Sequence, residues 1–88
     1  MTLYVTNQEY RAQKARLTRA KNSGDPLAVL AAVEKTLDEW SGKAWPDAWA
    51  RWAVALSDAY LAFLRLDYAQ RLTVDPDRFH AALDRIRA

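Results

Sequence analysis

Residues 45–72 read WPDAWARWAVALSDAYLAFLRLDYAQRL, and this stretch decides the fold. After Pro46 it contains neither glycine nor proline, the two residues that most often interrupt a helix. Proline itself is well accommodated in the first turn of a helix. The sequence therefore predicts one continuous helix over residues 46–72, about 40 Å long if each residue adds 1.5 Å.

The apolar residues of this predicted helix fall into two stripes when they are placed at 100° per residue. A broad face holds Trp45, Trp49, Trp52, Leu56, Tyr60, Phe63 and Leu64. A second stripe, at seven-residue spacing, holds Val54, Leu61 and Tyr68, with Leu72 beyond it. A helix that is apolar almost all round must be buried almost all round. Either the other helices surround it, or a second copy of the chain covers the second stripe.

The remaining glycines and prolines mark the joints of the chain, at NSGDP (22–26), SGKAWPD (41–47) and TVDP (73–76). They predict three further helices, over about 7–21, 26–40 and 76–87. Thr6 and Glu9 have the spacing of a capping box, and Gly24 can adopt the left-handed conformation that ends a helix. The predicted fold is all-α, a single domain over residues 1–88 with four helices and a long central third helix.

The composition excludes several classes of protein. The chain has 88 residues, no cysteine and one histidine, which exclude a disulfide framework, a thiolate nucleophile and a Cys/His zinc site. No run of about 18 apolar residues is present, so we predict no membrane span. The first residues, MTLYVT, lack the basic start and the apolar run of a secretory signal peptide. We therefore expect a cytoplasmic protein.

The small size of the chain favours self-association. A domain this short buries only about 60–65% of its unfolded surface, and the disulfides and metals that stabilise many small domains are excluded. We predict a homo-oligomer, with a dimer favoured, in which Val54, Leu61 and Tyr68 form the contact. The alternative is a monomer whose other helices, or whose N-terminal segment Leu3-Tyr4-Val5, cover the second stripe.

The charge is unevenly distributed, although the net charge is only +2. Residues 1–22 carry +4, residues 23–50 carry −3 and residues 51–88 carry +1. The basic side chains of the first helix are candidates for contact with nucleic acid or with an acidic partner: Arg11, Lys14, Arg16, Arg19 and Lys21. Such residues neutralise phosphates, but these five are spread around most of the helix. That distribution also fits a solvated helix paired with the acidic second helix.

Tryptophan is the other conspicuous residue type, at positions 40, 45, 49 and 52. Helical spacing of the last three is typical of a core stripe, whereas an exposed cluster would anchor a partner or stack on bases. Trp45 and Trp49 are the candidates for a partly exposed aromatic surface.

The sequence gives little support for catalysis. His80 has Asp84 one turn later, but nothing in the spacing links this pair to Ser57. We predict no catalytic residues, no metal ligands and no cofactor.

Three stretches resemble small uncharacterised accessory proteins of actinobacteriophages, in particular mycobacteriophages: YRAQKARLTRA (10–20), NSGDP (22–26) and WPDAWARW (45–52). The resemblance covers about residues 8–60 and implies a non-virion protein that binds a host or phage macromolecule in the bacterial host cytoplasm. It implies no site residues. The leading hypothesis is a helical protein-interaction module, and the alternative is a small DNA- or RNA-binding regulator that uses the basic first helix.

Overall fold

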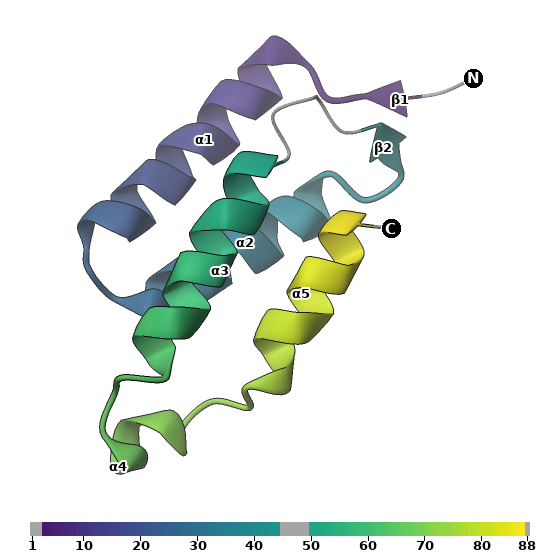
Figure 1. Cartoon of the computed structure of the whole chain (residues 1–88). Coiled ribbons are helices and arrows are strands. Elements are labelled where there is room, and N and C mark those ends of the chain that lie inside the picture. The colour runs from purple at the N-terminus through teal and green to yellow at the C-terminus, as the bar shows by residue number, and fades with distance from the viewer. Residues whose placement is uncertain (1–2, 45–49, 88) are drawn as a thin grey trace.

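The computed structural model describes residues 3–44 and 50–87, and these are mostly helical (Figure 1). In chain order the elements are β1 (Leu3–Tyr4), α1 (Asn7–Asn22), α2 (Pro26–Glu39), β2 (Lys43–Ala44), α3 (Ala50–Phe63), α4 (Tyr68–Arg71) and α5 (Asp77–Arg87). Three of the predicted helices are confirmed as α1, α2 and α5, each within one residue of its predicted bounds. The predicted all-α class is confirmed to the extent that helices make up most of the described residues, with two short strands beside them.

Side chains and a glycine at the joints account for these boundaries. Thr6 Oγ1 accepts a hydrogen bond from the backbone N–H of Glu9 at 3.1 Å and begins α1. Gly24, with φ +74°, separates α1 from α2 in the left-handed region that favours glycine. Asp25 Oδ1 then accepts from the N–H of Leu27 at 2.9 Å, with Pro26 as the first residue of α2. The capping residues inferred from the sequence are confirmed.

Helix α2 lies at the centre of the fold, where it packs against α1, α3 and α5 (Figure 1). Leu30 and Val33 of α2 have no exposed surface. At the C-terminal end of α2, Trp40 meets Trp52 of α3 edge to face, with ring centroids 5.1 Å apart. Tyr10 of α1 adds a second edge-to-face contact with Trp52 at 5.7 Å. This aromatic group joins the ends of three helices, and such contacts stabilise a core beyond their burial alone.

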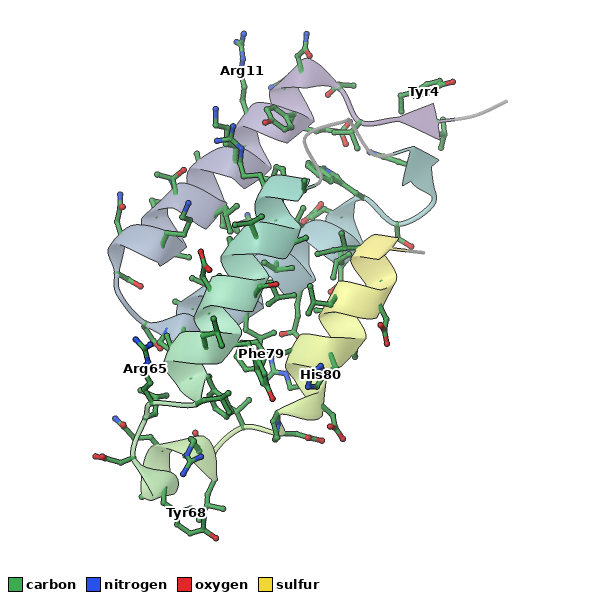
Figure 2. The ribbon with its side chains drawn as sticks, viewed as in Figure 1. Tyr4, Arg11, Arg65, Tyr68, Phe79 and His80 are labelled. Atoms are coloured by element: carbon green, nitrogen blue, oxygen red, sulfur yellow. The ribbon has the colours of Figure 1, made fainter. Side chains whose placement is uncertain are left out.

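A second aromatic group joins the lower end of α3 to α5, and Figure 2 shows Phe79 lying between these helices. The Phe79 ring, which is fully buried, lies 5.1 Å from that of Phe63 and 5.4 Å from that of Tyr60. Phe79 is thus the largest side chain that α5 buries in the core, beside the smaller buried side chains of Ala82 and Ile86.

The N-terminal segment pairs with the chain that follows α2. Leu3 and Tyr4 of β1 lie beside Lys43 and Ala44 of β2 in a two-stranded parallel ladder. Leu3 and Tyr4 are 59% and 70% exposed, while Val5 packs against the core. The idea that this segment covers the second apolar stripe is wrong, because Val54 remains 60% exposed.

The predicted continuous helix over residues 46–72 is also wrong. Its first residues, 46–49, lie outside the described residues, and α3 ends at Phe63. The N–H of Leu64 still bonds four residues back, to the carbonyl of Tyr60 at 3.0 Å, but that of Leu66 bonds only three back, to Phe63 at 3.1 Å. The last turn thus tightens before the helix stops. Leu66 packs against the core at this point, and the chain reverses so that α5 returns alongside α3.

A short helix, α4, follows the break. Asp67 is extended at its N-cap position, with φ −58° and ψ 150°, and its backbone N–H donates to Gln70 Oε1 at 3.3 Å. The spacing of an acidic N-cap residue and a glutamine three positions later is a helix-start signal. The sequence therefore contains a signal for a second helix start, at Asp67-Tyr68-Ala69-Gln70, within a stretch whose composition otherwise predicts one helix.

Candidate interaction surfaces

Two large aliphatic side chains protrude from the outer face of α3. Val54 and Leu61 are 60% and 57% exposed, and their seven-residue separation is close to two helical turns, which places them on one face. The opposite face, with Trp52, Leu56 and Phe63, is buried. The alternative in which other helices of the chain surround this helix is therefore wrong for these two side chains, which the described residues leave more than half exposed.

Tyr68, the third member of the predicted stripe, lies elsewhere. Because α3 ends at Phe63, Tyr68 is on α4, at the far end of the molecule, where it is 69% exposed (Figure 2). Leu64, which follows α3 directly, is 45% exposed beside this outer face. The seven-residue relation therefore stops at Leu61.

Charged side chains flank the exposed aliphatic ones. Arg51, Asp58 and Arg65 are all exposed. Together with Val54 and Leu61 they are separated by three, four, three and four residues in the chain, the spacing of one helix face, along α3 and the turn after it. Asp58 and Arg65 form no ion pair with any of the described residues. The outer face of α3 thus carries unpaired charges of both signs beside an apolar seam.

The basic residues of α1 do not pair with the acidic face of α2, contrary to that interpretation of the charge pattern. Arg11, Arg19 and Lys21 are exposed, and they form no ion pair with the described residues. Lys14 and Arg16 are partly buried, and Arg16 Nη1 donates to Gln13 Oε1 at 2.8 Å. Arg11, Arg19 and Lys21 therefore remain exposed to solvent.

The acidic face of α2 is instead partnered by arginines of α5. Arg78 holds the carboxylate of Glu34 with two donors, one of them Nε at 3.2 Å, and this bonding raises the pKa of Arg78 above its ordinary value. Arg85 Nη2 donates to Asp38 Oδ1 at 3.0 Å. The basic side chains that pair with the acidic residues of α2 thus come from α5 and not from α1, because α5 packs along the side of α2 that carries Glu34 and Asp38.

A groove between α1 and α2 brings three basic side chains together. Arg16 and Arg19 come from α1 and Lys35 from α2, over a floor that includes Ala20, Ala28, Ala31 and Ala32. In each helix the contributing residues follow the spacing i, i+3, i+4, i+7, which is one helix face. Lys35 was not among the predicted contact residues, although this matched spacing in the two helices would have indicated it.

The tryptophans divide between the core and the part of the chain that is not described. Trp40 and Trp52 are 1% and 0% exposed, so the core interpretation is confirmed for both. Trp45 and Trp49, the candidates for an exposed aromatic surface, lie outside the described residues.

A pocket of about 290 Å³ opens where α3, α4 and the start of α5 meet. Its walls include Tyr60, Phe63, Leu64, Tyr68 and Leu72, and Arg71 lines it as well. The pocket exists because the chain breaks after α3 and returns, so the prediction of a continuous helix could not reveal it.

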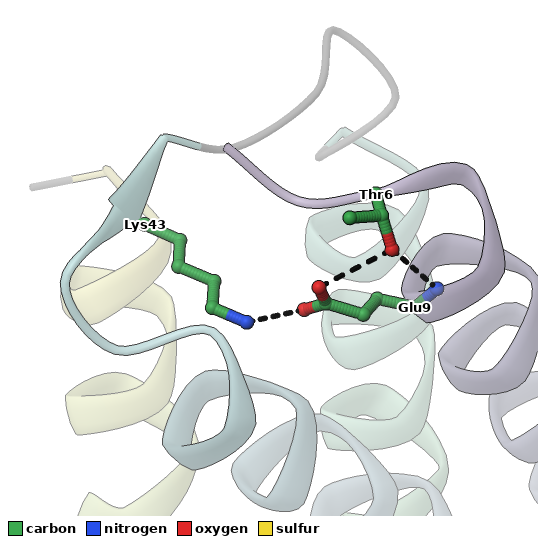
Figure 3. A network of polar contacts seen from close by, with 3 residues as sticks. All are labelled: Thr6, Glu9 and Lys43. Carbon is green, nitrogen blue, oxygen red and sulfur yellow. Dashed lines mark hydrogen bonds and ion pairs between the residues drawn. The ribbon is translucent and has the colours of Figure 1, made fainter. Parts of the chain in front are cut away.

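A polar network ties the start of α1 to β2 (Figure 3). Lys43 Nζ donates to Glu9 Oε2, and the Thr6 hydroxyl donates to Glu9 Oε1 at 3.2 Å. The hydrogen bond from Lys43 is the main reason that the pKa of Glu9 lies below its ordinary value, and burial opposes that shift. These contacts join the start of α1 to β2, so we assign the network a structural role.

The residues considered for catalysis are not assembled into a site. His80 is exposed, and its ring contacts Tyr60 edge to face at 5.0 Å. Within the described residues, no hydrogen bond joins His80 to Asp84 or to Ser57. No group of three or more potential metal-ligating side chains occurs in the same part of the chain.

These features define a small helical protein with two exposed apolar regions and one basic groove. In the described part of the chain, no helix has the length and apolar character needed to cross a bilayer. Scans against protein-family models, curated proteins and solved structures found no match.

Proposed function

We propose that this protein is a non-enzymatic helical interaction module that self-associates through the outer face of α3 and binds a host or phage protein. The observation that carries the proposal is the exposure of Val54 and Leu61, at 60% and 57%, on one face of a helix. Grouped exposed aliphatic side chains on a small protein mark an interaction site. The resemblance to actinobacteriophage accessory proteins supports a phage origin and action in the bacterial host cytoplasm.

The charges beside this seam suit an antiparallel pairing of two copies of α3. A two-fold axis near Leu61 and Leu64 sets Leu61 of one protomer against the partner's Leu64. The same axis brings Asp58 of one protomer close to the partner's Arg65, and two-fold symmetry repeats both contacts. Opposite charges that flank an apolar seam select orientation and partner in helix pairs of this kind. The end of this face around Leu61 is thus self-complementary in charge and in apolar contact, whereas Val54 lies opposite a part of the partner beyond the end of its α3.

Molar mass measured by size-exclusion chromatography with light scattering tests the self-association. The unmodified protein is expected to form a dimer at high micromolar concentration, and Leu61→Asp to be monomeric because it buries a charge in the seam. Ala12→Asp is the matched control, since Ala12 is exposed and belongs to α1. A monomeric unmodified protein removes the proposal.

Charge reversal tests the proposed orientation. Asp58→Arg alone and Arg65→Asp alone each place like charges together and weaken the dimer, whereas the double variant restores the opposite pairing. A double variant no stronger than the singles contradicts the antiparallel arrangement.

A second function, contact with DNA or RNA, is favoured by the basic groove of Arg16, Arg19 and Lys35. Gln13, the amide best placed in the sequence to contact a base edge, is only 6% exposed, and its oxygen accepts from Arg16 and Thr36. This alternative is therefore restricted to phosphate contacts without base recognition. It predicts that the protein binds duplex and single-stranded probes with an affinity that falls steeply as the salt concentration rises. The double variant Arg16→Gln, Arg19→Gln is expected to bind these probes more weakly. No binding at low salt removes it.

A further inference from the structure

The pocket between α3, α4 and α5 gathers three of the exposed large apolar side chains of the described residues. Leu64, Tyr68 and Leu72 are 45%, 69% and 67% exposed, and all three border the same cavity of about 290 Å³. Single exposed apolar residues are ordinary, whereas a group that rims a hollow marks a binding site.

The inner wall of this pocket is held firmly in place. Tyr60 and Phe63 both pack on the fully buried ring of Phe79, at centroid distances of 5.4 and 5.1 Å. On its other side Tyr60 contacts the ring of His80 at 5.0 Å. The aromatic wall is therefore fixed before any ligand arrives, which reduces the entropy lost on binding.

Arg71 gives the pocket its polar character. Its Nε is buried and has no hydrogen-bond acceptor among the described residues. Its guanidinium forms no ion pair there, although Asp67 and Asp75 are each four residues away along the chain. Arg71 thus brings to the lining of the pocket a positive charge that no described carboxylate neutralises, and an anionic ligand would complement it.

We propose that this pocket binds a small monocarboxylic acid whose body is one aromatic ring or one branched aliphatic group. The carboxylate accepts two parallel hydrogen bonds from the two Nη groups of Arg71, a bidentate geometry that guanidinium groups favour. The apolar body lies between Tyr60, Phe63 and Tyr68.

The size and charge of the pocket select this class of ligand. The cavity is at or below the lower end of the range typical for small-molecule sites, so it holds one ring or one branched chain and little more. A single arginine neutralises one carboxylate, whereas a nucleotide would bring several negative charges and a larger body. The site is separate from the self-association proposed for α3, except that Leu64 takes part in both.

Titration followed by nuclear magnetic resonance tests the proposal. Phenylacetate and 4-methylpentanoate are added to the ¹⁵N-labelled protein, and the Nε–H signal of Arg71 is followed together with the backbone amides of α4. Both acids are expected to shift these signals saturably, and phenylacetamide, which lacks the charge, to bind about tenfold more weakly or worse. Equal binding of the acid and the amide, or no shift with either acid, overturns the proposal.

Two variants separate the pocket from general attraction of anions. Arg71→Gln is expected to weaken binding of phenylacetate by about tenfold or more, whereas Arg65→Gln, which removes an exposed arginine outside the pocket lining, leaves it within about twofold. Retained ¹H–¹⁵N dispersion shows that each variant is folded. An equal loss in both variants would indicate non-specific charge attraction and contradict the site.

The same titration on Leu61→Asp separates the site from the proposed dimer. Binding that persists in this variant supports a pocket made by one chain alone. Binding that disappears with the dimer overturns the assignment to these residues of a single chain.

Discussion

The side chains of Gln13 and Thr36 meet in a buried polar contact between α1 and α2, where the single hydroxyl proton of Thr36 has two acceptors at 3.0 Å, Gln13 Oε1 and the carbonyl oxygen of Ala32. Thr36 is fully buried and Gln13 is 6% exposed. Oε1 of Gln13 also accepts from Arg16 Nη1 at 2.8 Å, which leads from this buried contact to the basic groove. A residue that lies among the cations of α1 in the sequence therefore acts in the packing of two helices.

Replacing Thr36 by valine keeps the shape of the side chain and removes the hydroxyl donor. The loss of this hydrogen bond, with its buried acceptor left partly unsatisfied, is expected to lower the free energy of unfolding by about 1–2 kcal/mol. Equilibrium unfolding in urea measures the change. Thr18→Val is the matched control, because the Thr18 hydroxyl bonds the Lys14 carbonyl at an exposed position. Equal stability of the two variants would contradict this role of Thr36.

Phe79 is expected to be the most sensitive residue of α5. Its ring contacts both Phe63 and Tyr60 and has no exposed surface, so Phe79→Ala should destabilise the protein by about 3–5 kcal/mol through lost contacts and a cavity. Phe79→Leu, which fills most of that volume, should lose less and remain folded. Thermal unfolding followed by circular dichroism ranks the two variants. If Phe79→Ala unfolded at the same temperature as the unmodified protein, the packing of α5 would not depend on this ring.

Gly24 offers a test of backbone strain that is free of packing effects. Its φ is +74°, and no atom lies within 4 Å of the position a Cβ would take. Gly24→Ala is therefore expected to destabilise the protein by about 1–2 kcal/mol through the left-handed conformation alone. Gly24→Asn should lose less, because asparagine tolerates this region. Urea unfolding that ranks Asn below Ala would be inconsistent with this account.

The ion pair of Glu9 with Lys43 predicts a dependence of stability on pH. The hydrogen bond from Lys43 holds the pKa of Glu9 below the ordinary value of 4.5. A carboxyl whose pKa is depressed by folding stabilises the folded state above its unfolded-state pKa, and this stabilisation is lost as the pH falls through the folded-state value. Unfolding curves between pH 7 and pH 3 should therefore show a smaller decline for Glu9→Gln than for the unmodified protein. Glu39→Gln, at an exposed position, is the control; an identical decline in both variants would exclude the ion pair as the cause.

Local signals in the sequence predicted most of the fold. Helices α1, α2 and α5 were placed within one residue, because Gly24, Pro26 and the Asp-Pro pair at 75–76 act on the backbone directly and need no distant contact. The break after Phe63 was missed, since residues 64–72 have ordinary helix formers and no glycine or proline. At this break Leu66 packs against the core, and the returning α5 places the ring of Phe79, sixteen positions after Phe63 in the chain, 5.1 Å from the Phe63 ring.

The sites were predicted less completely than the helices. That Val54 and Leu61 share a face follows from helical periodicity alone, since residues seven apart share a face wherever a helix forms, but their exposure is known only from the structure. Tyr68 does not join them, because that periodicity ends with α3. The pocket around Arg71 and the groove that adds Lys35 to Arg16 combine residues from different helices.

The sequence by itself determined where the chain starts and ends most of its helices, and which side of each helix is apolar, because capping and periodicity are local properties. Only the tertiary structure decided that α5 and not α1 neutralises the acids of α2, that Gln13 turns inward, and that the chain folds back after Phe63 to form a pocket. These outcomes depend on which helices become neighbours, and that choice rests on the fit of Trp40, Trp52, Phe63 and Phe79 in one shared core.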